Sequence, residues 1–169
     1  PQVTEEEILE GIFVDSAVSG LTYYTASGSG VTNIDGKFSY EETDETITFS
    51  IAGIVLGRCA PKEVLTPVDL VDGAVDETDT SVTNLCRLLL FLDSDGNPDN
   101  GITVTDEIIQ HMVNNNISLD IDDFKTAENN FENNTNVQIL INIMNAGGLF
   151  DDGDHALPTP EAARSHLAE

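Results

Sequence analysis

The sequence has few basic residues. Only 6 Lys and Arg stand against 31 Asp and Glu, which gives a formal net charge of −25 at pH 7 over 169 residues. Nucleic acid and anionic membrane surfaces would repel such a chain, so neither is an expected partner, whereas cations are. An acidic surface that serves solubility in a saline habitat explains the overall charge equally well.

Aromatic residues are scarce, and long apolar runs are missing. The chain has no Trp and only 6% aromatic residues, which argues against a typical sugar-stacking surface. It contains no run of 18 apolar residues, so membrane insertion is not expected. Its 40% hydrophobic content is nevertheless that of an ordinary globular protein. Because no apolar signal-like stretch precedes the globular part, we interpret the chain as a processed, exported product that is extracellular or on the cell surface.

Cysteine occurs only at Cys59 and Cys86. No CxxC or CxxCH spacing is present, and two distant cysteines do not make a zinc motif. An exported location predicts a Cys59–Cys86 disulfide, with two buried free thiols as the alternative.

Sequence signatures of enzymes are missing as well. The chain has no G-x-S-x-G, H-E-x-x-H, P-loop or dinucleotide-binding fingerprint. Pairs of carboxylates are uninformative, because 31 acidic residues make chance pairs inevitable. We therefore expect no catalytic residues, with a hydrolase of unrecognised site as the alternative, and we expect His166 to lie on an ordinary helix surface.

The N-terminal half shows the alternation of apolar and polar residues that is typical of β-strands. Ile47, Phe49 and Ile51 alternate with polar neighbours, and similar short runs precede them. In NIDGKFSY, Asp35-Gly36 predicts a tight hairpin turn, because Gly tolerates positive φ. Short strands at this spacing predict a small antiparallel β-sandwich.

The same half resembles known surface-protein modules. The stretch GVTNIDGKFSY resembles the hairpin of prealbumin-like modules, which are the carboxypeptidase-regulatory-like and Cna-B-like sandwiches of bacterial surface proteins. The wider run from FVDSAVSGLTYYT to TFSIAGIVLG is similar to an N-terminal region of exported bacterial lipoproteins and adhesins. These resemblances imply a prealbumin/Ig-like fold and a surface location, but no particular activity.

After Asp79 the periodicity becomes helical. DTSVTNLCRLLLFLD places its apolar residues on one stripe, with Asp79 or Thr80 as the N-cap. TDEIIQHMV, TNVQILINIMNAGG and TPEAARSHLAE predict three further helices, of which the first and last begin after Thr105 and Thr159. The predicted fold class is therefore α+β, with a β-sandwich region at 1–75 and a helical region at 76–169 packed as one compact unit.

The stretch LDSDGNPDNGITVTDEII crowds four Asp residues between two predicted helices. When Asp95 is counted as the first position of an EF-hand loop, Ile102 occupies the apolar eighth position. The expected Ca²⁺ ligands are then Asp95, Asn97, Asp99, the Gly101 carbonyl, Thr103 through water, and Asp106. Asn100 stands where the motif has Gly and is expected to accept positive φ.

Two alternatives to this loop assignment remain open. A count from Asp93 puts Pro98 at the Gly position and loses the apolar anchor, and an acidic exposed turn would bind no ion. The pattern D-x-N-x-D-x-x-I-x-x-x-D resembles the calcium loop of dockerins, although no second copy is present to imply cohesin binding. FDDGDH, residues 151–155 with the preceding Phe150, is interpreted as a solvated turn, or alternatively as a second cation site.

Together these patterns predict an exported, non-enzymatic, calcium-binding structural protein of the cell surface or matrix, acting as an adhesin or filament subunit. A filament would form when PQVTEEEILEGIFV adds as a strand to a neighbouring copy, which makes the chain its own partner. Pairing of this segment within its own domain is the alternative. The alternative function is a carbohydrate-binding or accessory module of a larger exported protein, with a glycan or surface receptor as its partner.

Overall fold

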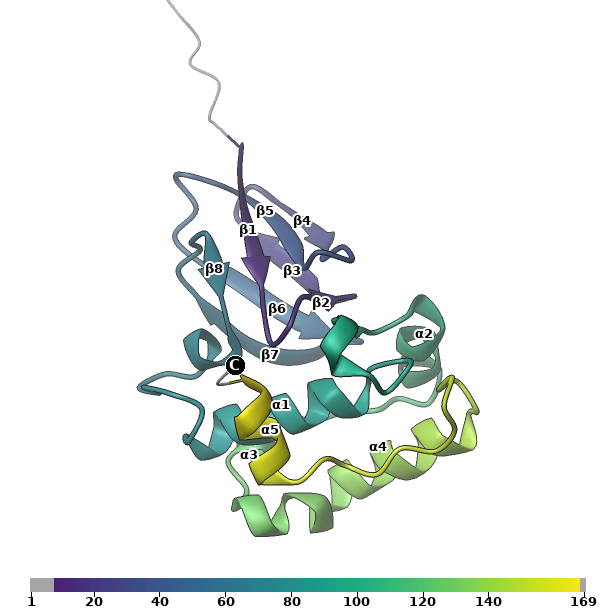
Figure 1. Cartoon of the computed structure of the whole chain (residues 1–169). Coiled ribbons are helices and arrows are strands. Elements are labelled where there is room, and N and C mark those ends of the chain that lie inside the picture. The colour runs from purple at the N-terminus through teal and green to yellow at the C-terminus, as the bar shows by residue number, and fades with distance from the viewer. Residues whose placement is uncertain (1–7, 168–169) are drawn as a thin grey trace, which may run out of the picture.

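Two small sheets form most of the N-terminal half of the chain (Figure 1). The computed structural model describes residues 8–167. One sheet has the strand order β4-β3-β6-β7, with all pairs antiparallel. The other has the order β5-β1-β8, in which β1 pairs antiparallel with β5 and parallel with β8. The strands are β1 (Ile8–Phe13), β3 (Thr22–Thr25), β4 (Gly28–Val31), β5 (Lys37–Glu41), β6 (Ile47–Ile51), β7 (Ile54–Cys59) and β8 (Val64–Leu65).

Aromatic side chains connect the two sheets. The Phe49 ring of β6 lies with its centroid 4.9 Å from that of Phe13 on β1 and 5.4 Å from that of Phe38 on β5. All three side chains are buried, because alternate residues of each strand point to the same face. The predicted alternation thus places the apolar side chains of both sheets in a common core.

The predicted hairpin at Asp35-Gly36 is wrong. Gly36 does have a positive φ of 74°, but β4 pairs with β3 and β5 pairs with β1, so the turn carries the chain from one sheet to the other. Asn33 stabilises this crossing, because its Oδ1 accepts hydrogen bonds from the backbone N–H groups of Asp35 and Lys37, at 2.9 and 3.0 Å. A turn signal gives the local backbone conformation and not the strand that the chain joins next.

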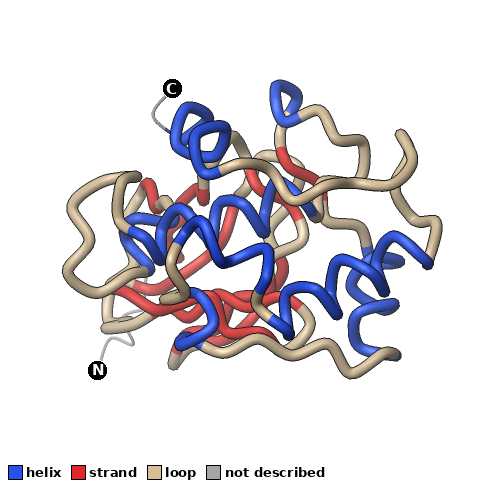
Figure 2. Tube along the Cα trace, turned by 90° about the horizontal axis from the view of Figure 1, so that it is seen from below, coloured by secondary structure: helices blue, strands red, loops and turns tan. Residues whose placement is uncertain are grey.

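Helices make up most of the C-terminal half and lie over the strands when the molecule is viewed from below (Figure 2). The N-caps predicted at Asp79, Thr105 and Thr159 are present, each side chain accepting a hydrogen bond from a backbone N–H of the first turn. The helices are α1 (Thr80–Phe91), α2 (Asp106–Asn114), α3 (Ile121–Phe124), α4 (Thr135–Ala146) and α5 (Pro160–Leu167), with 3₁₀ turns η1 (Pro67–Leu70), η2 (Pro98–Asn100) and η3 (Glu128–Asn133). The α+β class is therefore confirmed. None of the helices within residues 8–167 is long and apolar enough to cross a membrane.

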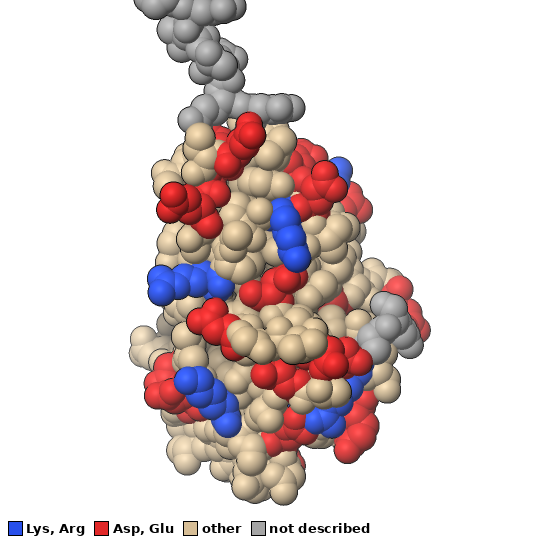
Figure 3. Space-filling model, turned by 90° about the vertical axis from the view of Figure 1, so that its left-hand side faces the viewer, with Lys and Arg blue, Asp and Glu red and all other residues tan. Residues whose placement is uncertain are grey.

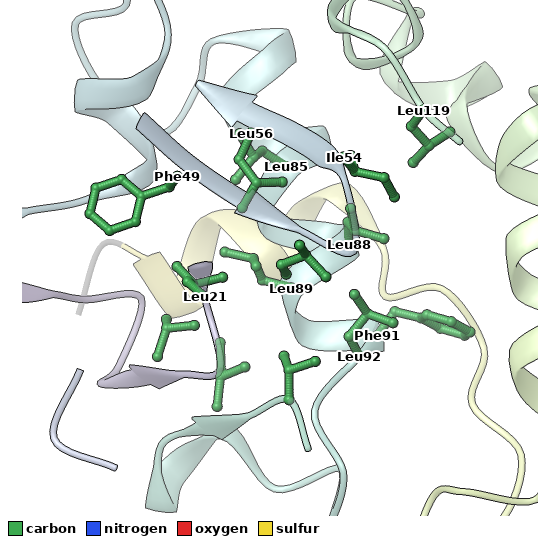
Figure 4. Close-up of a cluster of buried hydrophobic side chains, with 14 of the residues drawn as sticks. Leu21, Phe49, Ile54, Leu56, Leu85, Leu88, Leu89, Phe91, Leu92 and Leu119 are labelled. Carbon is green, nitrogen blue, oxygen red and sulfur yellow. The ribbon is translucent and has the colours of Figure 1, made fainter. Parts of the chain in front are cut away.

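Helix α1 packs against the four-stranded sheet (Figure 4). Its Leu85, Leu88 and Leu89 are almost fully buried and belong to the same apolar cluster as Leu56 of β7 and Phe49. The two halves of the chain are also joined by a short parallel pair of strands, β2 (Val18–Ser19) and β9 (Ile102–Thr103). This second link places the end of the loop that follows α1 beside β2, the strand that comes after β1 in the chain.

Strand β1 pairs within its own chain. Residues 8–12 lie opposite residues 37–41 of β5, and Ile12 and Phe13 also lie opposite β8. The remainder of the segment predicted to add to a neighbouring copy, residues 1–7, lies outside the described residues. The strand-addition hypothesis accordingly stays a prediction for that part of the chain.

The predicted Cys59–Cys86 disulfide is not formed, and both residues are free thiols. Cys59 ends β7 and packs at the margin of the main core, whereas Cys86 lies on α1 in a separate apolar cluster with Val82 and with Ala163 of α5. Burial raises the pKa of the Cys59 thiol to about 11 and that of Cys86 well above its ordinary value. The two thiols are therefore buried in different apolar clusters.

We expect both thiols to react slowly in the native protein and fully after denaturation. The thiolate is the reactive species, and a raised pKa keeps it scarce at pH 8. Titration with a thiol-specific reagent should find two thiols per chain in denatured, unreduced protein. If no thiol is found, the Cys59–Cys86 disulfide predicted from the sequence is formed after all.

Candidate cation-binding loop

The acidic loop between α1 and α2 is held at both ends by buried apolar residues. Leu92, which caps α1, and Ile102 of β9 are both fully buried. The Ile102 backbone N–H donates to the carbonyl of Ala17 at 2.9 Å, next to the β2–β9 pair. Ile102 thus serves as the apolar anchor that the loop pattern predicted. The polar residues between Leu92 and Ile102 form a short loop that is fixed at both ends.

The candidate ligands Asp95 and Asn97 are directed back into their own loop. Asp95 accepts the Asn97 backbone N–H at 2.9 Å and the Asn100 side-chain amide at 2.7 Å, and these two bonds lower the pKa of Asp95. Asn97 Oδ1 accepts the Asp99 backbone N–H at 3.2 Å. These local bonds give the loop a defined backbone shape.

The remaining candidate ligands are more widely distributed. Asp99 and Asp106 are exposed, and Asp106 is the first residue of α2. Positive φ falls at Gly96 (67°) and Gly101 (95°), so the expectation that Asn100 would adopt it is wrong. Within residues 8–167, no three His, Cys, Asp or Glu side chains are grouped as a metal site. Calcium binding by this set of six therefore stays a prediction.

Asp93, which the preferred count left out, is the most buried carboxyl of the loop. Only 1% of its surface is exposed, and its Oδ1 accepts the Thr103 backbone N–H at 2.9 Å. Its Oδ2 is buried without a hydrogen-bond partner among the described residues. Burial, together with the neighbouring Asp95 carboxylate, raises the pKa of Asp93 to about 6. The signal was present in the sequence, since a count from Asp93 was the alternative register.

A second acidic loop, residues 151–155, lies against the first. The Asp151 backbone N–H donates to the Ser94 carbonyl at 2.8 Å. His155 Nδ1 donates to the Phe91 carbonyl at 2.7 Å, its ring stacks on Phe150 with a 3.8 Å centroid separation, and its Nε2 lies 2.6 Å from Asp152 Oδ1. This hydrogen bond lowers the pKa of Asp152. Asp151, Asp152 and Asp154 are exposed, as expected of a solvated turn, and the segment also contacts the first loop.

The expectation that His166 lies on an ordinary helix surface is wrong. Its side chain is 10% exposed, and its Nδ1 lies 2.6 Å from Oδ1 of the buried Asp15. Its Nε2 lies 3.0 Å from Ser16 Oγ, at a turn where Ser16 has a positive φ of 53°. These contacts fasten the end of α5 to the turn that follows β1. Because Asp15 and His166 lie 151 positions apart, no local pattern could have paired them.

A groove of about 800 Å³ runs between β7 and the short helix α3. Leu56, Leu70 and Phe124 form part of its wall, and Tyr24 on β3 is its one substantially exposed aromatic ring. Carbohydrate sites commonly use several aromatic faces, so the groove gives the carbohydrate-binding alternative little support.

Comparison with known proteins gives one partial likeness. The chain is 48% identical over 59 residues to the protein named "Putative lipoprotein AcfD homolog" of Escherichia coli (strain K12). The matched region is 33% of this chain but only 4% of that protein, so the chain corresponds to a small part of a much longer relative. No family model matches the chain. No solved structure matches it either, so the prealbumin-like assignment stays a prediction.

Proposed function

We propose that this chain is a calcium-binding structural module of an exported, surface-located protein. The likeness to a lipoprotein supports the location, because lipoproteins are exported and held at a membrane surface. The acidic composition agrees with this proposal: Figure 3 shows Asp and Glu side chains spread over one face, with Lys and Arg interspersed among them. A bound divalent cation would reduce the mutual repulsion of these charges.

The observation that carries the proposal is the buried, unpartnered oxygen of Asp93 at the base of an acidic loop. A buried carboxylate oxygen without a hydrogen bond is costly, and ligation of a cation is one of the few ways to satisfy it. Calcium suits the site because it prefers carboxylate and carbonyl oxygens and tolerates irregular geometry. The loop also carries Asp95, Asn97 and Gly101, whose carboxylate, amide and backbone carbonyl oxygens are of this kind. The role proposed for the ion is to stabilise the junction of the two halves.

We expect calcium to raise the melting temperature of the protein. Extracellular calcium modules have dissociation constants of roughly 10⁻⁴–10⁻³ M. At 10 mM Ca²⁺ this corresponds to about 1.5–3 kcal/mol of added stability, or about 3–10 °C for a domain of this size. Calorimetric titration and thermal melts should be run against NaCl of equal ionic strength, since screening alone will stabilise so acidic a chain.

Two variants separate specific binding from screening. Asp95→Ala should abolish the increase in melting temperature that is specific to calcium. Asp35→Ala removes the same charge from an exposed loop of the β region, and this variant should still show that increase. If CaCl₂ raises the melting temperature of the wild-type chain no more than NaCl of equal ionic strength does, the proposal is refuted.

A further inference from the structure

The two acidic loops meet at Gly96. A Cβ at this position would overlap the Asp152 carboxylate, so a larger residue would displace that carboxylate from its place against the first loop. Gly96 also has a positive φ of 67°, which strains any other side chain. The hydrogen bond from the Asp151 backbone N–H to the Ser94 carbonyl also joins the two loops at this contact. Asp152 is thus placed beside Asp95 by features of both loops.

Asp93 lies at the base of this contact. Its Oδ2 is buried and unpartnered, and the carboxyl interacts electrostatically with Asp95 and with the His155 imidazole. Asp95 in turn interacts with Asp152. Asp95 therefore interacts with both Asp93 and Asp152, which lie on segments more than 50 positions apart in the chain. No N–H or O–H donor of residues 8–167 faces the buried Asp93 oxygen, and Asp95 can share a hydrogen bond with Asp93 only when one of the two carboxyls is protonated.

We propose that one Ca²⁺ ion binds between the two loops, with Asp93, Asp95 and Asp152 as its carboxylate ligands, and fastens the segment between α4 and α5 to the α1–α2 loop. The inference rests on the calcium-binding function proposed above and changes its ligand set. Asp93, Asp95 and Asn97 take the alternating positions at the start of a calcium loop. In this count the twelfth position is Val104, which has no carboxylate, and Asp152 supplies the carboxylate that an EF-hand takes from that position.

Among residues 8–167 no three carboxyls are already grouped around one point, so binding requires Asp152 to turn from its hydrogen bond with His155 toward Asp93 and Asp95. His155 is retained in place by the Phe91 carbonyl and by stacking on Phe150, so its ring can release Asp152 without leaving the site. The segment from α4 to α5, which returns across the helices in Figure 1, would then be held by the ion as well as by the Asp151 backbone bond.

Calorimetric titration of two matched variants with CaCl₂ tests the ligand set. Asp152→Asn and Asp154→Asn remove the same charge from the same loop, but Asp154 is exposed and has no ligand role in this proposal. We expect Asp152→Asn to weaken calcium binding by roughly tenfold or more and Asp154→Asn by less than about twofold. Equal effects of the two variants would overturn the proposal.

Hydrogen exchange provides the second measurement. Calcium should slow exchange in residues 148–158 of the wild-type chain and of Asp154→Asn, but not of Asp152→Asn. If Asp95→Ala abolishes binding while Asp93→Asn and Asp152→Asn leave it intact, the two-loop site is wrong and the calcium-binding function stands. If the wild-type chain binds no calcium, both are wrong.

Discussion

Replacing Arg87 with leucine is expected to lower the free energy of unfolding by about 3–5 kcal/mol, because it removes one partner of a buried polar network. Arg87 lies on α1 with 2% of its surface exposed. Its guanidinium donates to the carbonyls of Pro158 and Glu128, both at 2.7 Å, and to the Glu132 carboxylate at 2.8 Å. The side chain therefore ties two separate segments, η3 and the chain just before α5, to α1.

Two further variants define what this loss means. Arg87→Lys keeps the charge but cannot reach all three acceptors from one atom, so an intermediate loss is expected. Arg58→Leu, on the exposed face of β7, removes the same type of charge and should change stability by less than about 0.5 kcal/mol. Urea denaturation followed by circular dichroism measures all three. Similar losses for Arg58→Leu and Arg87→Leu would show that net charge, and not the network, is responsible.

The Arg87 bond to Glu132 also has a pH dependence. The hydrogen bond from Arg87 lowers the pKa of Glu132 below its ordinary value of 4.5. A carboxyl whose folded-state pKa is lowered contributes stability that is present above 4.5 and lost as the pH falls through the lowered value. As the pH falls from 4.5 through the lowered pKa of Glu132, the free energy of unfolding of Arg87→Leu should therefore decrease less than that of the wild-type chain.

The elements that the sequence predicted well are those with local causes. The helices begin at Asp79, Thr105 and Thr159 because each of these side chains satisfies an amide two or three residues ahead. The strands follow from alternation along a few residues, as in β6. Both the period and the capping groups are contained in the segment itself, so one sequence is sufficient to find them.

The features that the sequence did not predict depend on contacts between distant segments. The turn at Gly36 has the expected φ, yet β5 pairs with β1 because the second sheet needs a partner strand. The two thiols are separated by the faces on which they are buried. In the candidate site, Asp93 is distinguished from the other acids by its burial alone, and Asp152 reaches the loop from 57 positions away. Spacing along the loop offered Asp93 only as the start of the alternative register, and it carries no information on Asp152.

Replacing Phe49 with alanine should cost about 3–5 kcal/mol, the range for large-to-small changes of buried aromatic residues. Phe49 is fully buried on β6, and its ring contacts Phe13, Phe38 and Tyr23, with centroids 4.9, 5.4 and 6.3 Å away. The neighbouring strand offers a control, since Val55 on β7 is 41% exposed and Val55→Ala should cost less than about 1 kcal/mol.

The same variant tests whether the two halves unfold together. All three tyrosines lie in the β half and the chain has no Trp, so tyrosine fluorescence reports on the sheets while far-ultraviolet circular dichroism is dominated by the helices. Phe49 and Leu85 of α1 belong to one buried cluster, so loss of the ring should shift both signals by the same amount in urea. A shift of the tyrosine signal alone would mean that the sheets and helices are separate folding units, and that the contact in Figure 4 adds little to cooperativity.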